Sequence, residues 1–312
     1  MPGDALAGAA ASGYGSRPTR GTFLAVGASL SLYAAGMALN DWADRDEDAR
    51  DRPHRPLPSG RVRPAHALAA AGALTGTGLA LACRANRTTG AVATALAATV
   101  WAYDLRLKHT AAGPAAMGAA RALDLLMGAT ATGPPRSGCV PGPGVTATTA
   151  RSGPHDALAP TLTAALTLAI HTTAVTTVSR TEAQGGASTG PLTALGAGVG
   201  IAVALLSTRA GSLPRERPGA RTRHPWAKPT RSAPIAVALP VAAYAATALR
   251  PLFHAALNPS PQLTQRAVGA GIRALVPLQS ALAARSGAPM TALATLTLTP
   301  LPRRFAKKVS IT

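Results

Sequence analysis

Carboxylate side chains are concentrated in one short stretch of this chain. Six of the twelve Asp and Glu residues lie between positions 41 and 51, directly after an apolar run. Like charges this close together repel one another unless cations lie among them. Carboxylate oxygens are also the ligands that Mg²⁺ takes from proteins. The stretch is therefore a candidate metal site.

A continuous helix through this stretch would place its carboxylates on one face. At about 100° per residue, Asp41, Asp44, Asp48 and Asp51 lie within an arc of about 80°, with Asn40 at its edge. The first and third of these carboxylates are then about 10 Å apart along the axis, which is too far for one ion. Two Mg²⁺ ions bridging a diphosphate fit this spacing, because Mg²⁺ takes substrate phosphate as a ligand. The alternative is a solvated charge run neutralised by interleaved arginines.

The composition is typical of a membrane protein. Apolar residues make up 47% of the chain and charged residues only 14%, against about 25% charged in an ordinary soluble domain. Several apolar runs approach the roughly 20 residues that cross a bilayer as a helix. We expect an all-α, multi-span transmembrane bundle of about nine helices, forming a single domain over residues 1–312. The alternative is one large Ala-rich soluble helical domain. The apolar segments lie near residues 4–14, 21–40, 64–83, 88–105, 112–131, 157–178, 188–209, 232–257, 266–284 and 286–301.

The net charge of +19 favours anionic membrane lipids over nucleic acid as the partner. Its arginines lie in the connectors between apolar runs, where aromatic residues for base stacking are scarce. The basic loops near 41–63 and 104–112 predict a cytoplasmic location for both. We therefore expect a multi-pass protein of the cell membrane with its site facing the cytoplasm. The Arg-rich loop at 209–231 would then lie outside, although basic residues are usually enriched in cytoplasmic loops.

The acidic stretch also carries a family resemblance. The pattern N-D-x-x-D-x-x-x-D at Asn40, Asp41, Asp44 and Asp48, followed by R-P-L-P-S-G from Arg55, resembles the UbiA superfamily of intramembrane prenyltransferases. The resemblance implies a nine-helix bundle that binds an isoprenyl diphosphate through Mg²⁺ and transfers its prenyl group to a small-molecule or lipid acceptor. It also implies that the three aspartates are metal ligands, with the asparagine and the arginine at the substrate.

Two further places resemble the family. The segment Y-D-L-R-L-K-H makes Lys108 similar to the family's diphosphate-binding lysine, and the alternative is a helical i,i+4 pair with Asp104. Arg121 resembles the family's fifth-helix arginine that reaches the substrate head, and the alternative is an i,i+3 pair with Asp124. Ionisable residues at membrane depth are functional candidates. Either Asp124 or Asp104 could accept the proton that the acceptor releases.

One place departs from the family. Where a second Asp-rich motif is usual, this chain reads S-R-T-E-A-Q-G-G, with Glu182 as its one carboxylate. Either Glu182 is a metal ligand and Arg180 contacts the diphosphate, or the second ion is lost. The chain thus resembles a divergent branch of the superfamily. This change favours the alternative function, a non-catalytic membrane protein that binds or moves a lipid-like metabolite. A CDP-alcohol phosphotransferase is a third class, whose signature order is absent from this sequence.

The remaining candidates are weaker. The seven histidines show no metal-binding cluster, and His171, in the middle of an apolar run, is expected to be a packing residue with its hydrogen bonds satisfied. Cys83 and Cys139 would both lie in or near external segments, so a disulfide between them is conceivable. We expect no cleavable signal peptide, because the first residues lack a basic stretch before a compact apolar core.

Overall fold

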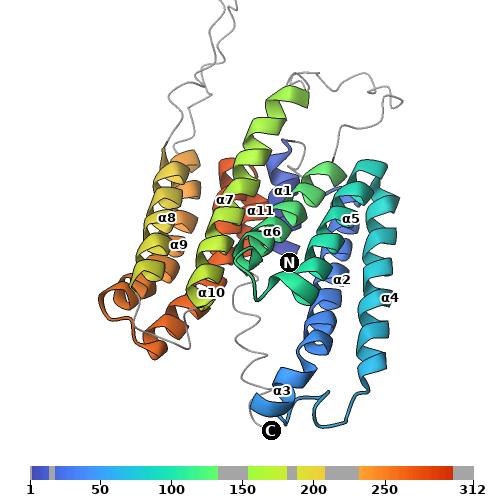
Figure 1. Ribbon diagram of the computed structural model, residues 1–312. Coiled ribbons are helices and arrows are strands. Elements are labelled where there is room, and N and C mark those ends of the chain that lie inside the picture. The colour runs from blue at the N-terminus through green and yellow to red at the C-terminus, as the bar shows by residue number, and fades with distance from the viewer. Residues whose placement is uncertain (1, 14–17, 133–153, 181–187, 208–231, 298–312) are drawn as a thin grey trace, which may run out of the picture.

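The computed structural model describes residues 2–13, 18–132, 154–180, 188–207 and 232–297. These residues form helices only, which confirms the all-α prediction. Figure 1 shows them as a bundle of roughly parallel and antiparallel rods. The elements are α1 (Pro2–Ala11), α2 (Arg20–Ala43), α3 (Arg45–Asp51), α4 (Pro64–Ala85), α5 (Arg87–Ala102), the π-helical turn η1 (Tyr103–Leu107), α6 (Gly113–Ala131), α7 (Pro154–Arg180), α8 (Thr189–Leu206), α9 (Ser232–Leu257), α10 (Pro261–Arg285) and α11 (Pro289–Thr297).

Six of the helices in the described part of the chain are long and apolar enough to cross a membrane, namely α2, α4, α7, α8, α9 and α10. Large apolar side chains such as Phe23, Leu166, Val203 and Ile235 are about half exposed or more on the outside of the bundle. An apolar surface of this extent is typical of a face that contacts lipid or a partner. The structure therefore agrees with a multi-pass membrane protein.

The half of the bundle that carries the acidic stretch consists of α2, α4, α5 and α6. Leu32, Leu96 and Met127 from three of these helices are buried in one cluster with small alanines. Capping residues define the helix ends. Thr19 caps α2 through a reciprocal pair of hydrogen bonds with Thr22, and Asn86 accepts the Thr89 N–H at the start of α5. The acidic stretch thus follows directly from a well-packed helix.

The short helix α1 lies inside the bundle, packed against α6, α7 and α10. Eight of its ten residues are buried. Its approach to α6 requires glycine, because a Cβ at Gly8 would overlap the Leu125 carbonyl and one at Gly128 would overlap the backbone of Ala5. A Cβ at Gly72, by contrast, would have no other atom within 4 Å.

Both basic loops predicted to face the same side lie at one end of the bundle. Figure 1 shows α3 and the α3–α4 connection at the lower end of α2. Trp42 and Asp44, where α2 ends, line a hollow together with Lys108 and His109, which follow η1. Arg180, the last residue of α7, hydrogen-bonds to the same turn. The predicted external loop at 209–231 lies outside the described residues.

Candidate active site

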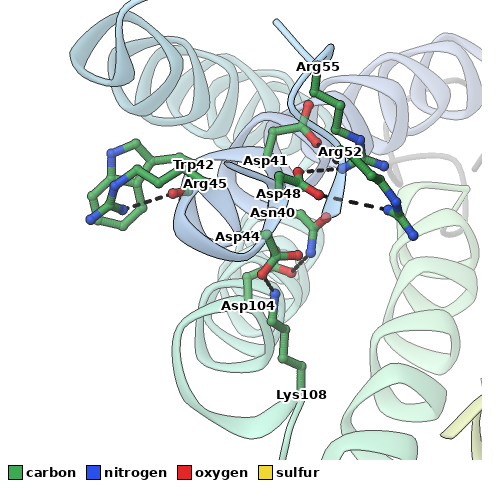
Figure 2. A network of polar contacts seen from close by, with 10 residues as sticks. All are labelled: Asn40, Asp41, Trp42, Asp44, Arg45, Asp48, Arg52, Arg55, Asp104 and Lys108. Atoms are coloured by element: carbon green, nitrogen blue, oxygen red, sulfur yellow. Dashed lines mark hydrogen bonds and ion pairs between the residues drawn. The ribbon is translucent and has the colours of Figure 1, made fainter. Parts of the chain in front are cut away.

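The helix of the acidic stretch is interrupted at Asp44. This residue has φ −90° and ψ 4° and separates α2 from α3. Hydrogen bonds from Asp44 N to Asn40 O (2.9 Å) and from Asp48 N to Asp44 O (2.8 Å) continue the helical pattern across the interruption. The prediction of one continuous helix is therefore wrong at Asp44. The aspartates nevertheless project toward two neighbouring groups of basic residues, as Figure 2 shows.

Arg55 lies between the outer two predicted metal ligands. Its Nη1 is 2.6 Å from Asp48 Oδ2 and 3.7 Å from Asp41 Oδ1. Arg52 adds a longer contact, 3.9 Å from Asp48 Oδ1. The Asp48 side chain is only 7% exposed, and a buried carboxylate needs such partners to stay ionised. Arg55, the first residue of the R-P-L-P-S-G segment, thus neutralises two carboxylates of the N-D-x-x-D-x-x-x-D pattern.

Lys108 forms an ion pair with Asp44, and both side chains are mostly buried. Burial lowers the pKa of the Lys108 ammonium, and the neighbouring carboxylate opposes that effect. The alternative helical pair with Asp104 is not formed, because Asp104 instead accepts a hydrogen bond from Asn40 Nδ2 at 3.3 Å. The π-turn closes through a bond from Lys108 N to Tyr103 O at 3.0 Å. Turns of this type are often found at functional sites.

Two hollows meet beside these groups. The first, of about 350 Å³, lies between α2, α5, η1 and α6 and has a mostly apolar wall. The second, of about 360 Å³, is lined by charged residues of α3 and the turn after η1. Asp104 lines both, so the apolar cavity adjoins the charged hollow. The apolar cavity is lined by Ser29, Leu32, Tyr33, Gly36, Met37, Asn40, Leu96, Val100, Tyr103, Asp104, Met117, Ala120, Arg121 and Asp124.

The sequence signature of the UbiA prenyltransferase family matches residues 4–213. The chain belongs to this family. Two curated members show the extent of the similarity. A digeranylgeranylglyceryl phosphate synthase of Methanopyrus kandleri is 38% identical over 96 residues, which are 31% of this chain and 35% of that protein. A 4-hydroxybenzoate octaprenyltransferase of Sodalis glossinidius is 36% identical over 91 residues, or 28% of this chain and 31% of that protein. The matches thus span about a third of each relative.

Two solved structures of UbiA proteins share the fold. An apo UbiA homologue from Aeropyrum pernix K1 superposes with a TM-score of 0.59 at 16% identity, covering 95% of this chain and 97% of that one. A digeranylgeranylglyceryl phosphate synthase structure gives 0.56 at 13% identity, with 91% of each chain covered. The predicted resemblance and the predicted fold class are both confirmed.

The Asp-rich motifs of this family generally bind Mg²⁺, and the residues present here suit that ion. Carboxylate oxygens of Asp44 and Glu47 and a ring nitrogen of His109 all lie within 4.8 Å of one another. Oxygen ligands at an accessible hollow suit Mg²⁺, which keeps part of its water shell. The sequence shows no cluster of histidines, and it did not single out His109 as a partner of these carboxylates. Glu47 also comes from the acidic stretch, although its position there did not single it out.

Arg121 and Asp124 have different partners from those considered in the sequence. Arg121 Nη1 donates to Asp4 Oδ2 of α1 at 2.8 Å, and Gln279 of α10 donates to the other oxygen of Asp4 at 2.6 Å. Asp124 accepts the Ser29 hydroxyl of α2 at 2.8 Å. Arg121, Asp124 and Ser29 line the apolar cavity. The predicted substrate contacts of Arg121 and Asp124 stay predictions. Asp4 was missed, although a lone carboxylate in an apolar segment is itself a signal.

Among the described residues, the partners of the Arg180 side chain are backbone carbonyls. Its Nη1 donates to Thr110 O at 2.6 Å and its Nη2 to His109 O at 3.4 Å. Its predicted role at the diphosphate stays a prediction, but the turn that it holds carries Lys108. Glu182, the proposed ligand of the second motif, lies outside the described residues. Cys139 does too, so the disulfide is not tested.

His171 is the satisfied packing residue that the sequence predicts. It is buried, with Nδ1 3.1 Å from the Tyr244 hydroxyl and Nε2 3.0 Å from Gly271 O. These bonds join α7 to α9 and α10. The histidine therefore connects three helices away from the charged hollow.

Proposed function

We propose that this protein transfers the prenyl group of an isoprenyl diphosphate to an acceptor inside the membrane. The supporting observation is the junction of a charged hollow with an apolar cavity at Asp104. A prenyl diphosphate has the same two parts, an anionic head and a hydrocarbon chain. The head would occupy the charged hollow and the chain the apolar cavity.

The head group would be held by both signs of charge. Asp44 would supply the central metal ligand, with Asp41 and Asp48 on the side of Arg55. Lys108 and Arg55 would leave their carboxylate partners to bind phosphate oxygens, as charge-assisted bonds to phosphate are strong. Mg²⁺ bound there would neutralise charge on the diphosphate as it leaves.

The reaction would be cleavage of the bond between C1 of the prenyl group and the diphosphate oxygen. Both bonding electrons leave with the diphosphate, whose charge Lys108 and Arg55 stabilise. An electron-rich carbon or oxygen of the acceptor then bonds to C1 and loses its proton. Asp104 borders both hollows, whereas Asp124 lines only the apolar one, so Asp104 would accept this proton. Asn40 orients it by donating to Oδ1. The apolar wall excludes water from the reactive carbon.

The relatives guide the choice of acceptor. The names of the two curated proteins specify a glyceryl phosphate lipid in one case and an aromatic acid in the other. We propose an acceptor of one of these classes for this chain. The basic loops around the site support a location on the cytoplasmic side of the cell membrane, next to anionic lipids.

Binding of a radiolabelled geranylgeranyl diphosphate to the purified full-length protein tests this proposal. Asp44→Asn keeps the side-chain volume and removes the charge at the centre of the site. Asp51→Asn is the matched control, because that residue is exposed and is not among the residues that line either hollow. We expect Mg²⁺-dependent binding that Asp44→Asn weakens at least about tenfold, since each lost charged contact is worth about 1.5–3 kcal/mol. The control should bind like the wild type.

Turnover is then measured with an aromatic acid and a glyceryl phosphate lipid as acceptors. Binding that is indifferent to both Mg²⁺ and Asp44→Asn would refute the proposal. Binding without transfer to either class would favour the non-catalytic carrier.

A further inference from the structure

His109 lies beside two carboxylates of the charged hollow, those of Asp44 and Glu47. Asp44 lies between α2 and α3. Glu47 is three residues further along the chain, about one helical turn away on the same side. The ligand atoms of these two residues and of His109 are all within 4.8 Å of one another. All three residues line the charged hollow. Donor atoms on one ion at bonds of about 2.0–2.2 Å can be at most about 4.4 Å apart. A small rotation of the exposed Glu47 and His109 side chains would therefore bring the three ligand atoms close enough together to bind one ion.

The backbone of His109 is held in place by another helix. Both Arg180 contacts fall on this turn, one of them on the His109 carbonyl itself. The turn is also closed internally by a bond from Thr110 N to Leu107 O at 2.9 Å. A ligand on a fixed turn costs less conformational entropy to order than one on a free loop. The arginine at the end of α7 thus supports the metal site without touching the metal.

The sequence offers few carboxylates elsewhere for this purpose. The stretch after α7 contains Glu182 as its one acidic residue between positions 179 and 186. A histidine on the turn after η1 would add one more protein ligand to the metal site, from a segment other than the one after α7. This change in ligand type alters which metal the site prefers.

We propose that His109 coordinates the metal of this site through its imidazole, beside Asp44 and Glu47, and so raises the affinity of the site for transition-metal dications relative to Mg²⁺. The proposal rests on the function proposed above and adds a ligand to its metal site. Mg²⁺ favours oxygen ligands, whereas imidazole suits the later first-row dications, whose affinity for nitrogen sites increases from Mn²⁺ to Co²⁺ and Ni²⁺. Coordination would use the nitrogen lone pair of the neutral ring.

Two measurements on the full-length protein in lipid nanodiscs test the proposal. Pulsed EPR of bound Mn²⁺ detects ¹⁴N when an imidazole is a ligand. We expect this signal in the wild type and in His54→Ala, an exposed histidine of the α3–α4 connection, and its loss in His109→Ala. Calorimetric titration should show His109→Ala weakening Co²⁺ binding at least about tenfold, because even outer-shell partners are worth that much. Mg²⁺ binding should change by less than about twofold, since Mg²⁺ depends on the carboxylates.

The outcomes separate the two proposals. Bound Mn²⁺ that depends on Asp44 but lacks the ¹⁴N signal would overturn the role of His109 and leave the proposed function intact. An unchanged preference for Co²⁺ over Mg²⁺ in His109→Ala would do the same. Failure of Mn²⁺, Co²⁺ and Mg²⁺ to bind, with or without a prenyl diphosphate, would overturn the proposed function as well.

Discussion

Replacing Lys108 by Gln should change metal binding and diphosphate binding in opposite directions. In the structure the Lys108 ammonium pairs with Asp44, with side chains 12% and 21% exposed. A dication must displace the ammonium before it can use this carboxylate. The substitution removes that competition, so Mg²⁺ alone should bind more tightly. A diphosphate should bind less tightly, because it loses a cationic partner.

The expected size follows from the environment of the pair. Coulomb attraction at about 4 Å with an effective dielectric constant near 20 is about 4 kcal/mol, an upper bound. Partial exposure to solvent reduces this figure, and fully exposed pairs contribute only about 0–1 kcal/mol. We take about 1.5 kcal/mol, which corresponds to roughly tenfold in affinity. Mg²⁺ should therefore bind about tenfold more tightly to Lys108→Gln, and an uncleavable prenyl thiodiphosphate about tenfold more weakly at saturating Mg²⁺.

Isothermal titration of the protein in nanodiscs measures both affinities. Arg106→Gln is the matched control, because it removes one positive charge from the same turn at an exposed position. The control should change both affinities by less than about twofold, as expected for a screened surface charge. A Lys108→Gln variant that binds Mg²⁺ no better than the wild type would show that Lys108 does not compete with Mg²⁺ for Asp44. Weaker binding of both ligands would refute the competition argument outright.

Three further predictions concern the bundle. Asp4→Asn removes the charge that neutralises buried Arg121, which should cost about 3–5 kcal/mol and lower the midpoint of thermal unfolding in detergent; an unchanged midpoint would contradict the pairing. His171→Phe leaves a buried hydroxyl and a carbonyl without their partner, so we expect a loss of about 1–3 kcal/mol in the same assay. Gly128→Val should prevent α1 from docking and abolish a monodisperse peak in size-exclusion chromatography, whereas Gly72→Val, which meets open space, should elute like the wild type.

Helix positions could be predicted well because apolar runs and their boundaries are local features. The run expected at 64–83 is α4, Pro64–Ala85, which begins at a proline in its first turn. The run expected at 266–284 begins earlier, at Pro261, because Ser260 caps the helix and accepts the Leu263 N–H. Polar residues in the first two turns of the helix, including Gln262, Thr264 and Arg266, interrupt the apolar pattern there. The capping residue is therefore present in the sequence, but a hydropathy pattern alone does not detect the helix start that it marks.

Partners of charged residues could not be predicted in the same way. Spacing on one helix suggested Arg121 with Asp124 and Lys108 with Asp104, and neither pair is formed as a salt bridge among the described residues. Arg121 pairs with Asp4, 117 positions away. A helical i,i+3 or i,i+4 pair contributes only about 0.2–0.5 kcal/mol. A partner across a buried interface competes more strongly, because it relieves the desolvation cost of both charges.

The same reasoning explains why the acidic stretch suits reversible binding of a charged ligand. Three of its carboxylates, those of Asp41, Asp44 and Asp48, each have a cation from another segment beside them. Arg55 lies against Asp41 and Asp48, while Lys108 lies against Asp44. A metal–diphosphate complex contains both signs of charge, so it can replace each cation at its carboxylate and then bind that cation through phosphate. Because every charge keeps a partner before and after binding, the exchange avoids the cost of leaving a buried charge alone. We therefore expect metal and diphosphate to bind together much more tightly than either binds by itself.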